Sequence, residues 1–272
     1  MGYLLIGPVT RDKNIIQDKK TIKTGGAVYY QSKVFSKLGV EHTSLITLSK
    51  KDKKLLEDFP PKTRIVPIWK KTTLEFENHY LNPEKRIQKS NFAKNPIKIK
   101  DIKPIIKANW DSILLNPLLP TDIPTQTLKY ITRKNTTHIN LQGYLRKEKN
   151  GKVTPKKPKN IKKLLEMADK VFLDKEESRI FKPNPLKAAK FLGSMGPSET
   201  IITCGEKGSI IYSNKRHWKI KAVPAKQIIN PTGLGDTYMA AYIHKRKDSH
   251  PLKAGKFASK IATKKLEGLL DP

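Results

Sequence analysis

The chain has 272 residues, and its 55 lysine and arginine residues against 24 acidic ones give a formal net charge of +31 at pH 7. This length is enough for one large domain with a sizeable core, and no apolar run approaches the roughly 20 residues that a membrane-spanning helix needs. The single cysteine, Cys204, excludes an internal disulfide and a cysteine-based metal site. The first residues have no basic signal-peptide pattern, so we expect a cytoplasmic protein.

The excess of positive charge raises the question of nucleic-acid binding. Most of the cations are lysine, whereas bidentate contacts to phosphates and bases favour arginine. The lysines are spread along the chain, apart from a run in residues 147–163, and no aromatic residues are interleaved for base stacking. We interpret them as a solvated surface that also attracts anionic substrates such as ATP, and we expect no specific nucleic-acid partner.

Short apolar runs alternate with helical periods, a pattern typical of an α/β fold: a Rossmann-like, mainly parallel sheet with helices on both faces. The predicted strands are residues 4–6, 43–47, 112–115, 137–141, 171–173 and 200–203, followed by a hairpin of residues 209–212 and 217–221. The predicted helices are residues 27–38, 124–132, 160–168 and 185–192, the segment after Asp236, and residues 251–266. Gly39 is a typical stop for the first helix.

Two polar stretches, about residues 11–24 and 63–92, interrupt this pattern and alternate polar with apolar side chains like extended strands. We expect them to form a small β-sheet, a lid that excludes water from the active cleft. Its exposed face is a surface through which two copies could form a homodimer. Residues 147–159, rich in lysine and proline, are predicted to be a solvated loop. The whole of residues 1–272 is predicted to be a single domain.

The most informative motif is Pro231-Thr232-Gly233-Leu234-Gly235-Asp236-Thr237, directly before a predicted helix. A glycine-rich turn that opens a helix offers backbone N–H groups and the positive end of the helix dipole to an anion. An anion hole beside a carboxylate base is what phosphoryl transfer to a hydroxyl requires, so the motif predicts a small-molecule kinase. A Gly-x-Gly turn followed by a capping Asp is also a common structural feature, and this alternative stays open.

Three further motifs precede this one. They are Ile6-Gly7-Pro8-Val9-Thr10-Arg11-Asp12, the pair Gly25-Gly26 before a helix, and Thr203-Cys204-Gly205-Glu206-Lys207-Gly208. Together the four motifs resemble, in order and over nearly the whole chain, the ribokinase-like (PfkB) family of carbohydrate and nucleoside kinases. Residues 26–30, 72–76, 115–117 and 141–146 are similar to an archaeal-type branch that includes myo-inositol kinase-like enzymes. The resemblance implies a ribokinase-like fold.

The resemblance also implies roles for individual residues. Asp236 would be the general base, beside an anion hole formed by Gly233, Leu234 and Gly235. The donor ATP would be held by Thr203, Gly205, Gly208, Asp174 and Glu177, and Glu177 would bind Mg²⁺ through water. The acceptor, a sugar or polyol with a myo-inositol-like molecule favoured, would be bound by Asp12, Gly25, Gly26, Tyr30, Gln142 and Arg146.

Some positions depart from the family's pattern. Asp174 stands where the family usually has Asn. Asn230 stands where the family usually has an Asp tied to monovalent-cation activation, which predicts little dependence on potassium. Tyr30 replaces an Asn that touches substrate in sugar-specific members, which disfavours ribose.

Several alternatives stay open. The acceptor could be a nucleoside, or the chain could be a catalytically weak relative that binds nucleic acid. Asp12 could cap a turn, Gly25-Gly26 could be a plain turn, Glu177 could be a solvated residue at a helix start, and Arg146 could lie on the surface. The histidines are scattered without metal-ligand spacing, so none is assigned to a metal.

Overall fold

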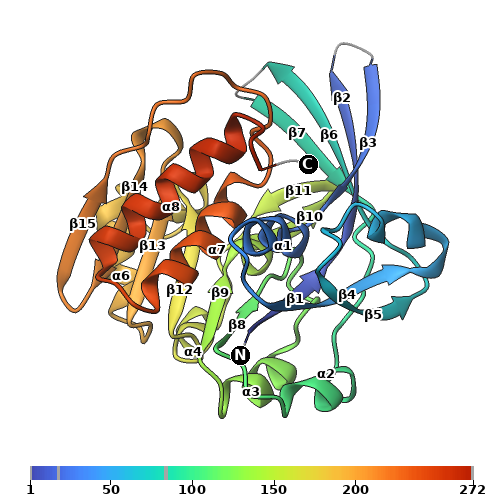
Figure 1. Ribbon diagram of the computed structural model, residues 1–272, viewed down its shortest axis with the longest axis horizontal. Coiled ribbons are helices and arrows are strands. Elements are labelled where there is room, and N and C mark those ends of the chain that lie inside the picture. The colour runs from blue at the N-terminus through green and yellow to red at the C-terminus, as the bar shows by residue number, and fades with distance from the viewer. Residues whose placement is uncertain (1, 17–18, 83–84, 271–272) are drawn as a thin grey trace.

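The computed structural model describes residues 2–16, 19–82 and 85–270, and two β-sheets organise them (Figure 1). The larger sheet has nine strands, in the spatial order β15 (Arg216–Ile220), β14 (Ser209–Ser213), β13 (Glu199–Thr203), β12 (Lys170–Asp174), β9 (Thr137–Asn140), β8 (Ser112–Leu115), β1 (Tyr3–Pro8), β4 (His42–Ser49) and β5 (Arg64–Lys70). The strands from β13 to β5 run parallel, and β14 and β15 add an antiparallel edge.

Strand β1 illustrates why helices cover both faces of the larger sheet. Its side chains alternate between two apolar cores: Tyr3 and Leu5 belong to one, and Leu4 and Ile6 belong to the other. The first core is completed by α1 (Ala27–Lys37), α7 (Leu234–Arg246) and α8 (Pro251–Leu266). The second is completed by α2 (Ile99–Ile106), α3 (Thr125–Thr132), α4 (Ile161–Leu165) and α6 (Pro185–Gly193). Strands buried on both faces are apolar throughout, and the predicted fold class is confirmed.

The smaller sheet has six strands, in the order β10 (Arg146–Lys149), β11 (Lys152–Pro155), β7 (Lys85–Ser90), β6 (Leu74–Asn82), β2 (Thr10–Ile16) and β3 (Lys19–Gly25). Strands β2 and β6 pair in parallel, and the other neighbours pair antiparallel. A third apolar core lies under this sheet, where Leu74 and Phe76 of β6 pack with Leu118 and Leu119. The smaller sheet therefore has one face fixed against the body of the protein.

Two predictions about the smaller sheet are wrong. Residues 64–70 were predicted to belong to the lid, but they form β5 in the larger sheet, where Ile65, Val66 and Ile68 pack against its two cores. Residues 147–159 were predicted to be a solvated loop. Most of them are exposed, as predicted, but they contain most of the β10–β11 hairpin, which extends the smaller sheet beyond β7. The assignment of the whole chain to one domain stays a prediction.

The helices agree more closely with the sequence. Helix α1 ends before Gly39, which adopts a φ of +67°, and α8 covers the predicted residues. Helix α4 is shorter than predicted. Helix α2 was not predicted; it contains Pro104, a residue that disfavours helix interiors, within its last turn.

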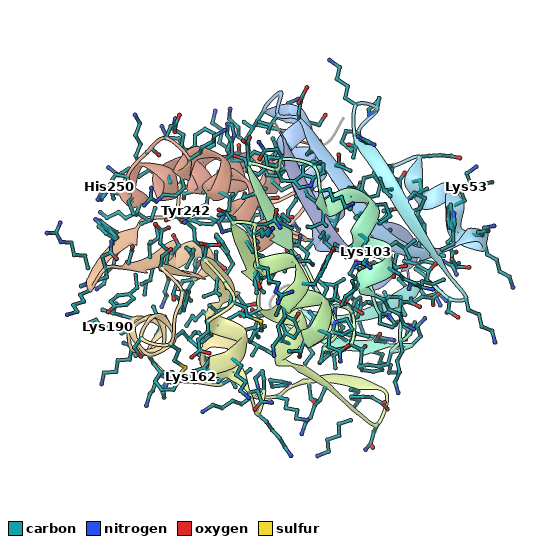
Figure 2. The ribbon with its side chains drawn as sticks, turned by 90° about the horizontal axis from the view of Figure 1, so that it is seen from below. Lys53, Lys103, Lys162, Lys190, Tyr242 and His250 are labelled. Carbon is teal, nitrogen blue, oxygen red and sulfur yellow. The ribbon has the colours of Figure 1, made fainter. Side chains whose placement is uncertain are left out.

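The lysines lie mainly on the outside of the molecule. Figure 2 shows Lys53, Lys103, Lys162 and Lys190 projecting from different parts of the ribbon, and all four are exposed, whereas Tyr242 is fully buried. This distribution agrees with a solvated basic surface. Within the described part of the chain, no helix combines the length and the apolar character needed to cross a membrane.

Candidate active site

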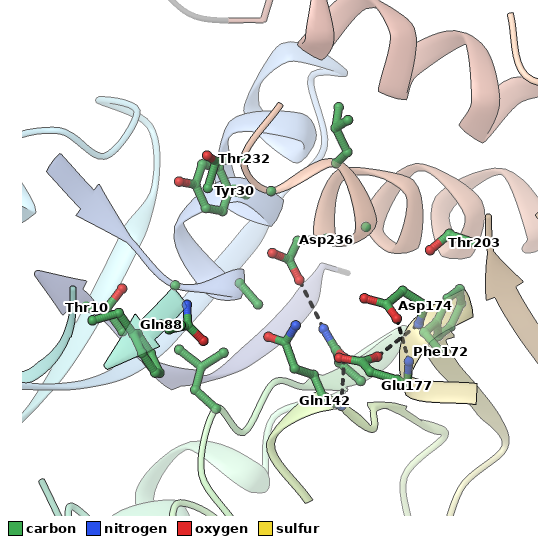
Figure 3. Close-up of a pocket in the computed structure, with 18 of the residues that line it drawn as sticks. Thr10, Tyr30, Gln88, Gln142, Phe172, Asp174, Glu177, Thr203, Thr232 and Asp236 are labelled. Atoms are coloured by element: carbon green, nitrogen blue, oxygen red, sulfur yellow. Dashed lines mark hydrogen bonds between the residues drawn. The ribbon is translucent and has the colours of Figure 1, made fainter. Parts of the chain in front are cut away.

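A cavity of about 380 Å³ lies where the carboxyl ends of the larger sheet's parallel strands face the smaller sheet (Figure 3). In open α/β sheets, ligands bind outside the carboxyl ends of the strands. Asn140, Asp174 and Thr203 are the last residues of β9, β12 and β13, and all three line the cavity. The smaller sheet contributes Thr10, Asp12, Phe76, Asn78, Gln88 and Arg146.

The turn that opens α7 forms one wall of this cavity. Gly233, the N-cap, has a φ of +78°, and a Cβ added there would lie 2.3 Å from Cγ of Tyr30. Only glycine fits such a position without displacing its neighbour. A Cβ added at Gly235 would meet nothing within 4 Å, so the space beside this residue is open. The backbone of Gly233, Leu234 and Gly235 thus presents an accessible helix N-terminus to an anion.

Asp236 follows in the first turn of α7 and faces the same cavity. Its Oδ1 accepts a hydrogen bond from Nδ2 of Asn140 at 3.0 Å. Desolvation raises the pKa of Asp236 to about 6, against the opposing effects of the Arg146 charge and the Asn140 hydrogen bond. A carboxylate with this pKa is mostly ionised at pH 7 and is more basic than an ordinary aspartate.

Asp174 and Glu177 form a capping box where β12 passes into α5 (Lys175–Ser178). The Glu177 N–H donates to Asp174 Oδ1 at 2.7 Å, and the Asp174 N–H donates to Glu177 Oε2 at 2.9 Å. Desolvation, followed by the neighbouring Asp174 charge, raises the pKa of Glu177 to about 7. Desolvation also raises the pKa of Asp174. Two adjacent, desolvated carboxyl groups favour a bound cation, because the cation stabilises their ionised forms.

The cation that best fits this pair is Mg²⁺. Among the described residues, no group of three or more His, Cys, Asp or Glu side chains is placed to hold a metal ion. Mg²⁺ keeps several of its waters and is often bound through one or two carboxylates together with substrate phosphates. Asp174 and Glu177, both in the cavity wall, match that requirement.

Arg146 lies among these carboxylates rather than on the surface. It begins β10, its Nη1 donates to the Leu118 carbonyl at 3.3 Å, and its guanidinium lies 5.2 Å from the centre of the Phe76 ring. Its charge lowers the pKa values of Asp236, Asp174 and Glu177. Gln142, predicted beside it, donates a side-chain hydrogen bond to Glu177.

Of the predicted acceptor residues, all but Gly25 line the cavity: Asp12, Gly26 and Tyr30, together with Gln142 and Arg146. Asp12 in β2 is 9% exposed, and Gly26 and Tyr30 lie at the start of α1. Gly25 does not line the cavity, but a Cβ there would come within 2.2 Å of Asp12 Oδ2. Its absent side chain therefore makes room for the Asp12 carboxylate. Gly26 has a φ of +99°, and a Cβ there would lie 2.5 Å from the Pro8 carbonyl oxygen.

Several lining residues were not among the predicted site residues. Gln88 Nε2 donates to Asn78 Oδ1 at 2.9 Å, and Asn78 Nδ2 donates to Asn14 Oδ1 at 3.0 Å, which fixes the amides of three strands. Because side chains alternate along β6, Asn78 lies on the same face as Phe76. The sequence pattern could therefore have indicated Asn78 as a lining residue. Asn140, the partner of Asp236, carries no local signal, because the two residues are 96 positions apart.

Only part of the predicted nucleotide loop, residues 203–208, lines the cavity. Thr203 lines the cavity, but Gly205 and Gly208 do not. Gly208 has a φ of +84°, and a Cβ there would lie 1.8 Å from the Ile220 carbonyl oxygen, so glycine is needed for the turn itself. The nucleotide-binding role of Gly205 and Gly208 stays a prediction.

Two curated relatives match short parts of the chain. A nucleoside kinase of Methanothermobacter thermautotrophicus is 41% identical over 73 residues, which are 26% of this chain and 23% of that protein. A nucleoside kinase of Methanocaldococcus jannaschii is 42% identical over 43 residues, 16% of this chain and 14% of the relative. Both matches span less than a quarter of the relative's length.

Solved structures match nearly the whole chain. A pyrophosphate-dependent kinase in the ribokinase family, complexed with a pyrophosphate analog and myo-inositol, has a TM-score of 0.87 at 22% identity, with 97% of this chain and 95% of that chain covered. A ribokinase from Arabidopsis thaliana complexed with ribose and ATP has a TM-score of 0.75 at 16% identity, with 98% and 92% covered. At these identities the likeness shows a shared fold.

The family itself follows from the sequence comparison. Residues 98–267, more than half of the chain, match the pfkB family of carbohydrate kinases. This region contains Asp174, Glu177 and the Gly233–Asp236 turn, and the fold agrees with the match. The chain belongs to the pfkB carbohydrate kinase family.

Proposed function

We propose that this protein transfers the γ-phosphoryl group of ATP to a hydroxyl of a small polyol or sugar, with a myo-inositol-like acceptor favoured. The observation that carries the proposal is the pairing of Asp236 with an open helix N-terminus in one cavity. The smaller sheet adds a carboxylate and two side-chain amides to the lining of that cavity: Asp12, Asn78 and Gln88. Such groups match the alternating donors and acceptors of a polyhydroxylated ring.

The reaction can be described through the chain's own residues. Asp236 accepts the proton of the acceptor hydroxyl while that oxygen attacks the γ-phosphorus and the bond to the leaving diphosphate breaks. The N–H groups of Gly233, Leu234 and Gly235 stabilise the negative charge on the transferring group. Arg146, which lines the same cavity, adds a positive charge. Mg²⁺ held through Asp174, Glu177 and water would neutralise donor phosphate charge.

The cavity lining bears on the identity of the phosphoryl donor. The lining includes Thr203 but not Gly205 or Gly208, and its polar groups, the Gly233–Asp236 turn and Arg146, are suited to phosphates. This observation favours pyrophosphate as a second candidate donor. A solved structure with the same fold is a pyrophosphate-dependent kinase. We retain ATP as the proposed donor and test both.

The deciding experiment measures transfer from Mg-ATP and from Mg-pyrophosphate to a panel of polyols, sugars, sugar phosphates and nucleosides. We expect turnover with a polyol, detected as ADP or orthophosphate release together with the phosphorylated product. Turnover with nucleosides alone would replace the proposed acceptor. No turnover with any member, together with salt-sensitive binding of oligonucleotides, would favour a nucleic-acid-binding relative.

Glu177→Gln is expected to raise the Mg²⁺ concentration needed for half-maximal activity by about tenfold, the effect typical of altering a residue that supports a metal site. The measurement is a magnesium titration at saturating donor and acceptor. Glu176→Gln, the neighbouring residue on the exposed side of α5, is the matched control. An unchanged magnesium titration for Glu177→Gln would remove the residue from the metal site.

Turnover is expected to change less than about twofold when potassium replaces a bulky organic cation at constant ionic strength. The reason is that Asn230 is a neutral amide and supplies no charge to hold a monovalent cation. The measurement is the initial rate at several potassium concentrations. Strong activation by potassium would contradict the expectation.

A further inference from the structure

Helix α8 carries a buried lysine close to the active site. Lys265 lies in the last turn of this helix and is 1% exposed, whereas its neighbour Lys264 is exposed. Burying an ammonium group is costly unless its surroundings compensate for the lost hydration. One such compensation is visible: Nζ of Lys265 lies 5.6 Å from the centre of the Tyr30 ring, within the range of a cation–π interaction.

Tyr30 connects this lysine to the Gly233–Asp236 turn that opens α7, called the anion turn below. Its ring lines the cavity and packs so closely on Gly233 that a Cβ at Gly233 would lie 2.3 Å from the ring (Figure 3). Gly233 is the N-cap of α7 and the first residue of the proposed anion hole. The ring therefore contacts both the Lys265 ammonium and the backbone that would bind the transferring phosphoryl group.

A second connection runs from the same turn of α8. The N–H groups of Ile229 and Asn230 both donate to the carbonyl of Leu266, at 2.9 and 3.1 Å. These residues belong to the segment that leads into Pro231 and the glycine turn. The end of α8 thus holds the approach to the turn by hydrogen bonds and the turn itself through Tyr30.

We propose that Lys265 is a positioning residue for phosphoryl transfer: its ammonium holds the Tyr30 ring against Gly233 and fixes the anion hole in the geometry that binds the donor phosphates. The inference rests on the proposed function, because it assigns the turn to phosphate binding. A fixed positive charge behind the turn also adds to the attraction of an anion. A misplacement of about 1 Å at such a site can cost up to ~10²-fold in rate.

The first test measures binding of inorganic pyrophosphate with Mg²⁺ by calorimetry, without an acceptor, so that it does not depend on turnover. We expect Lys265→Met to weaken pyrophosphate binding by about tenfold, Lys265→Arg to restore most of it, and Lys264→Met to leave it unchanged. Equal affinities for Lys265→Met and Lys264→Met would overturn the inference. If wild-type protein binds pyrophosphate but phosphorylates no acceptor, the proposed function fails while the positioning role is still decided by the variants.

The second test asks whether the effect passes through Tyr30. Tyr30→Leu is expected to weaken pyrophosphate binding by a similar factor, and the double variant with Lys265→Met is expected to be no worse than either single variant. Additive losses would show that the two residues act independently and would overturn the inference. If Lys265→Met does not fold, as judged by circular dichroism, the decision falls to Tyr30→Leu and Lys265→Arg. Unchanged binding in Tyr30→Leu would then reject the connection.

Discussion

Replacing Asp236 with asparagine is expected to lower kcat by about 10²- to 10⁴-fold, the contribution typical of a positioned general base. The amide keeps the size of the side chain but cannot accept the acceptor's proton. It also keeps one oxygen for the hydrogen bond from Asn140. The fold and the donor site should therefore persist, and donor binding measured by calorimetry should stay within about twofold of the wild-type value.

The matched control is Asp248→Asn, which makes the same change at an exposed carboxylate just beyond the end of α7. This variant should have wild-type kcat. A retained turnover in Asp236→Asn would assign the proton transfer to another group, for which Asp12 is a candidate because it lines the same cavity and its charge acts on Asp236. Loss of donor binding together with turnover would instead assign Asp236 a role in holding the donor.

The architecture was largely predictable because it depends on local patterns. The alternation of apolar runs with helical periods indicated a parallel sheet with helices on both faces, and β1 shows the reason, since its alternate side chains enter two different cores. Helix ends with strong chemical signals, such as Gly39 after α1, were also predictable.

The errors fall where long-range pairing overrides local pattern. Residues 64–70 were grouped with the polar, alternating stretch of the predicted lid, but most of them are apolar and their partner is β4 in the larger sheet. Residues 146–149 and 152–155 carry so many lysines that they look solvated, yet they form a hairpin whose sheet edge is set by a pairing between Lys152 and Lys89. No local property of these segments reveals their partner.

The residues of the candidate site also fall into two groups: those that lie close together in sequence, and those that only the fold brings together. The anion turn is contiguous in sequence and was predicted from residue types and spacing, whereas Asp174 and Glu177 were implied by the resemblance to the family. The amide network of Asn78 and Gln88 and the contact between Asn140 and Asp236 join distant segments. Lys265 was not predicted either, because in sequence it is one lysine among many, and only the fold shows it buried.

Arg146→Met is expected to lower kcat at pH 7 by about 10²- to 10³-fold, a loss comparable to removing one group that stabilises transition-state charge. It is also expected to change the pH dependence. Asp236 must be ionised to act as a base, so activity rises with pH through its pKa of about 6. The Arg146 charge lowers the pKa values of Asp236 and Glu177, the latter about 7. Without that charge both pKa values rise, and the acidic limb of the profile moves to higher pH.

The measurement is kcat/KM from pH 5 to 9, which reports the ionisation of the free enzyme. Arg146→Lys keeps the charge but loses the planar guanidinium, so its acidic limb should stay in place while kcat falls. Lys147→Met, at the next and exposed position of β10, should match the wild-type protein in both respects. A profile for Arg146→Met with an unmoved acidic limb would show that Arg146 does not set the protonation of the catalytic carboxylates. If the acidic limb moves but the plateau of kcat/KM is unchanged, the role of Arg146 is limited to setting these pKa values. The charge of the transferring phosphoryl group would then be stabilised by the helix N-terminus and the metal.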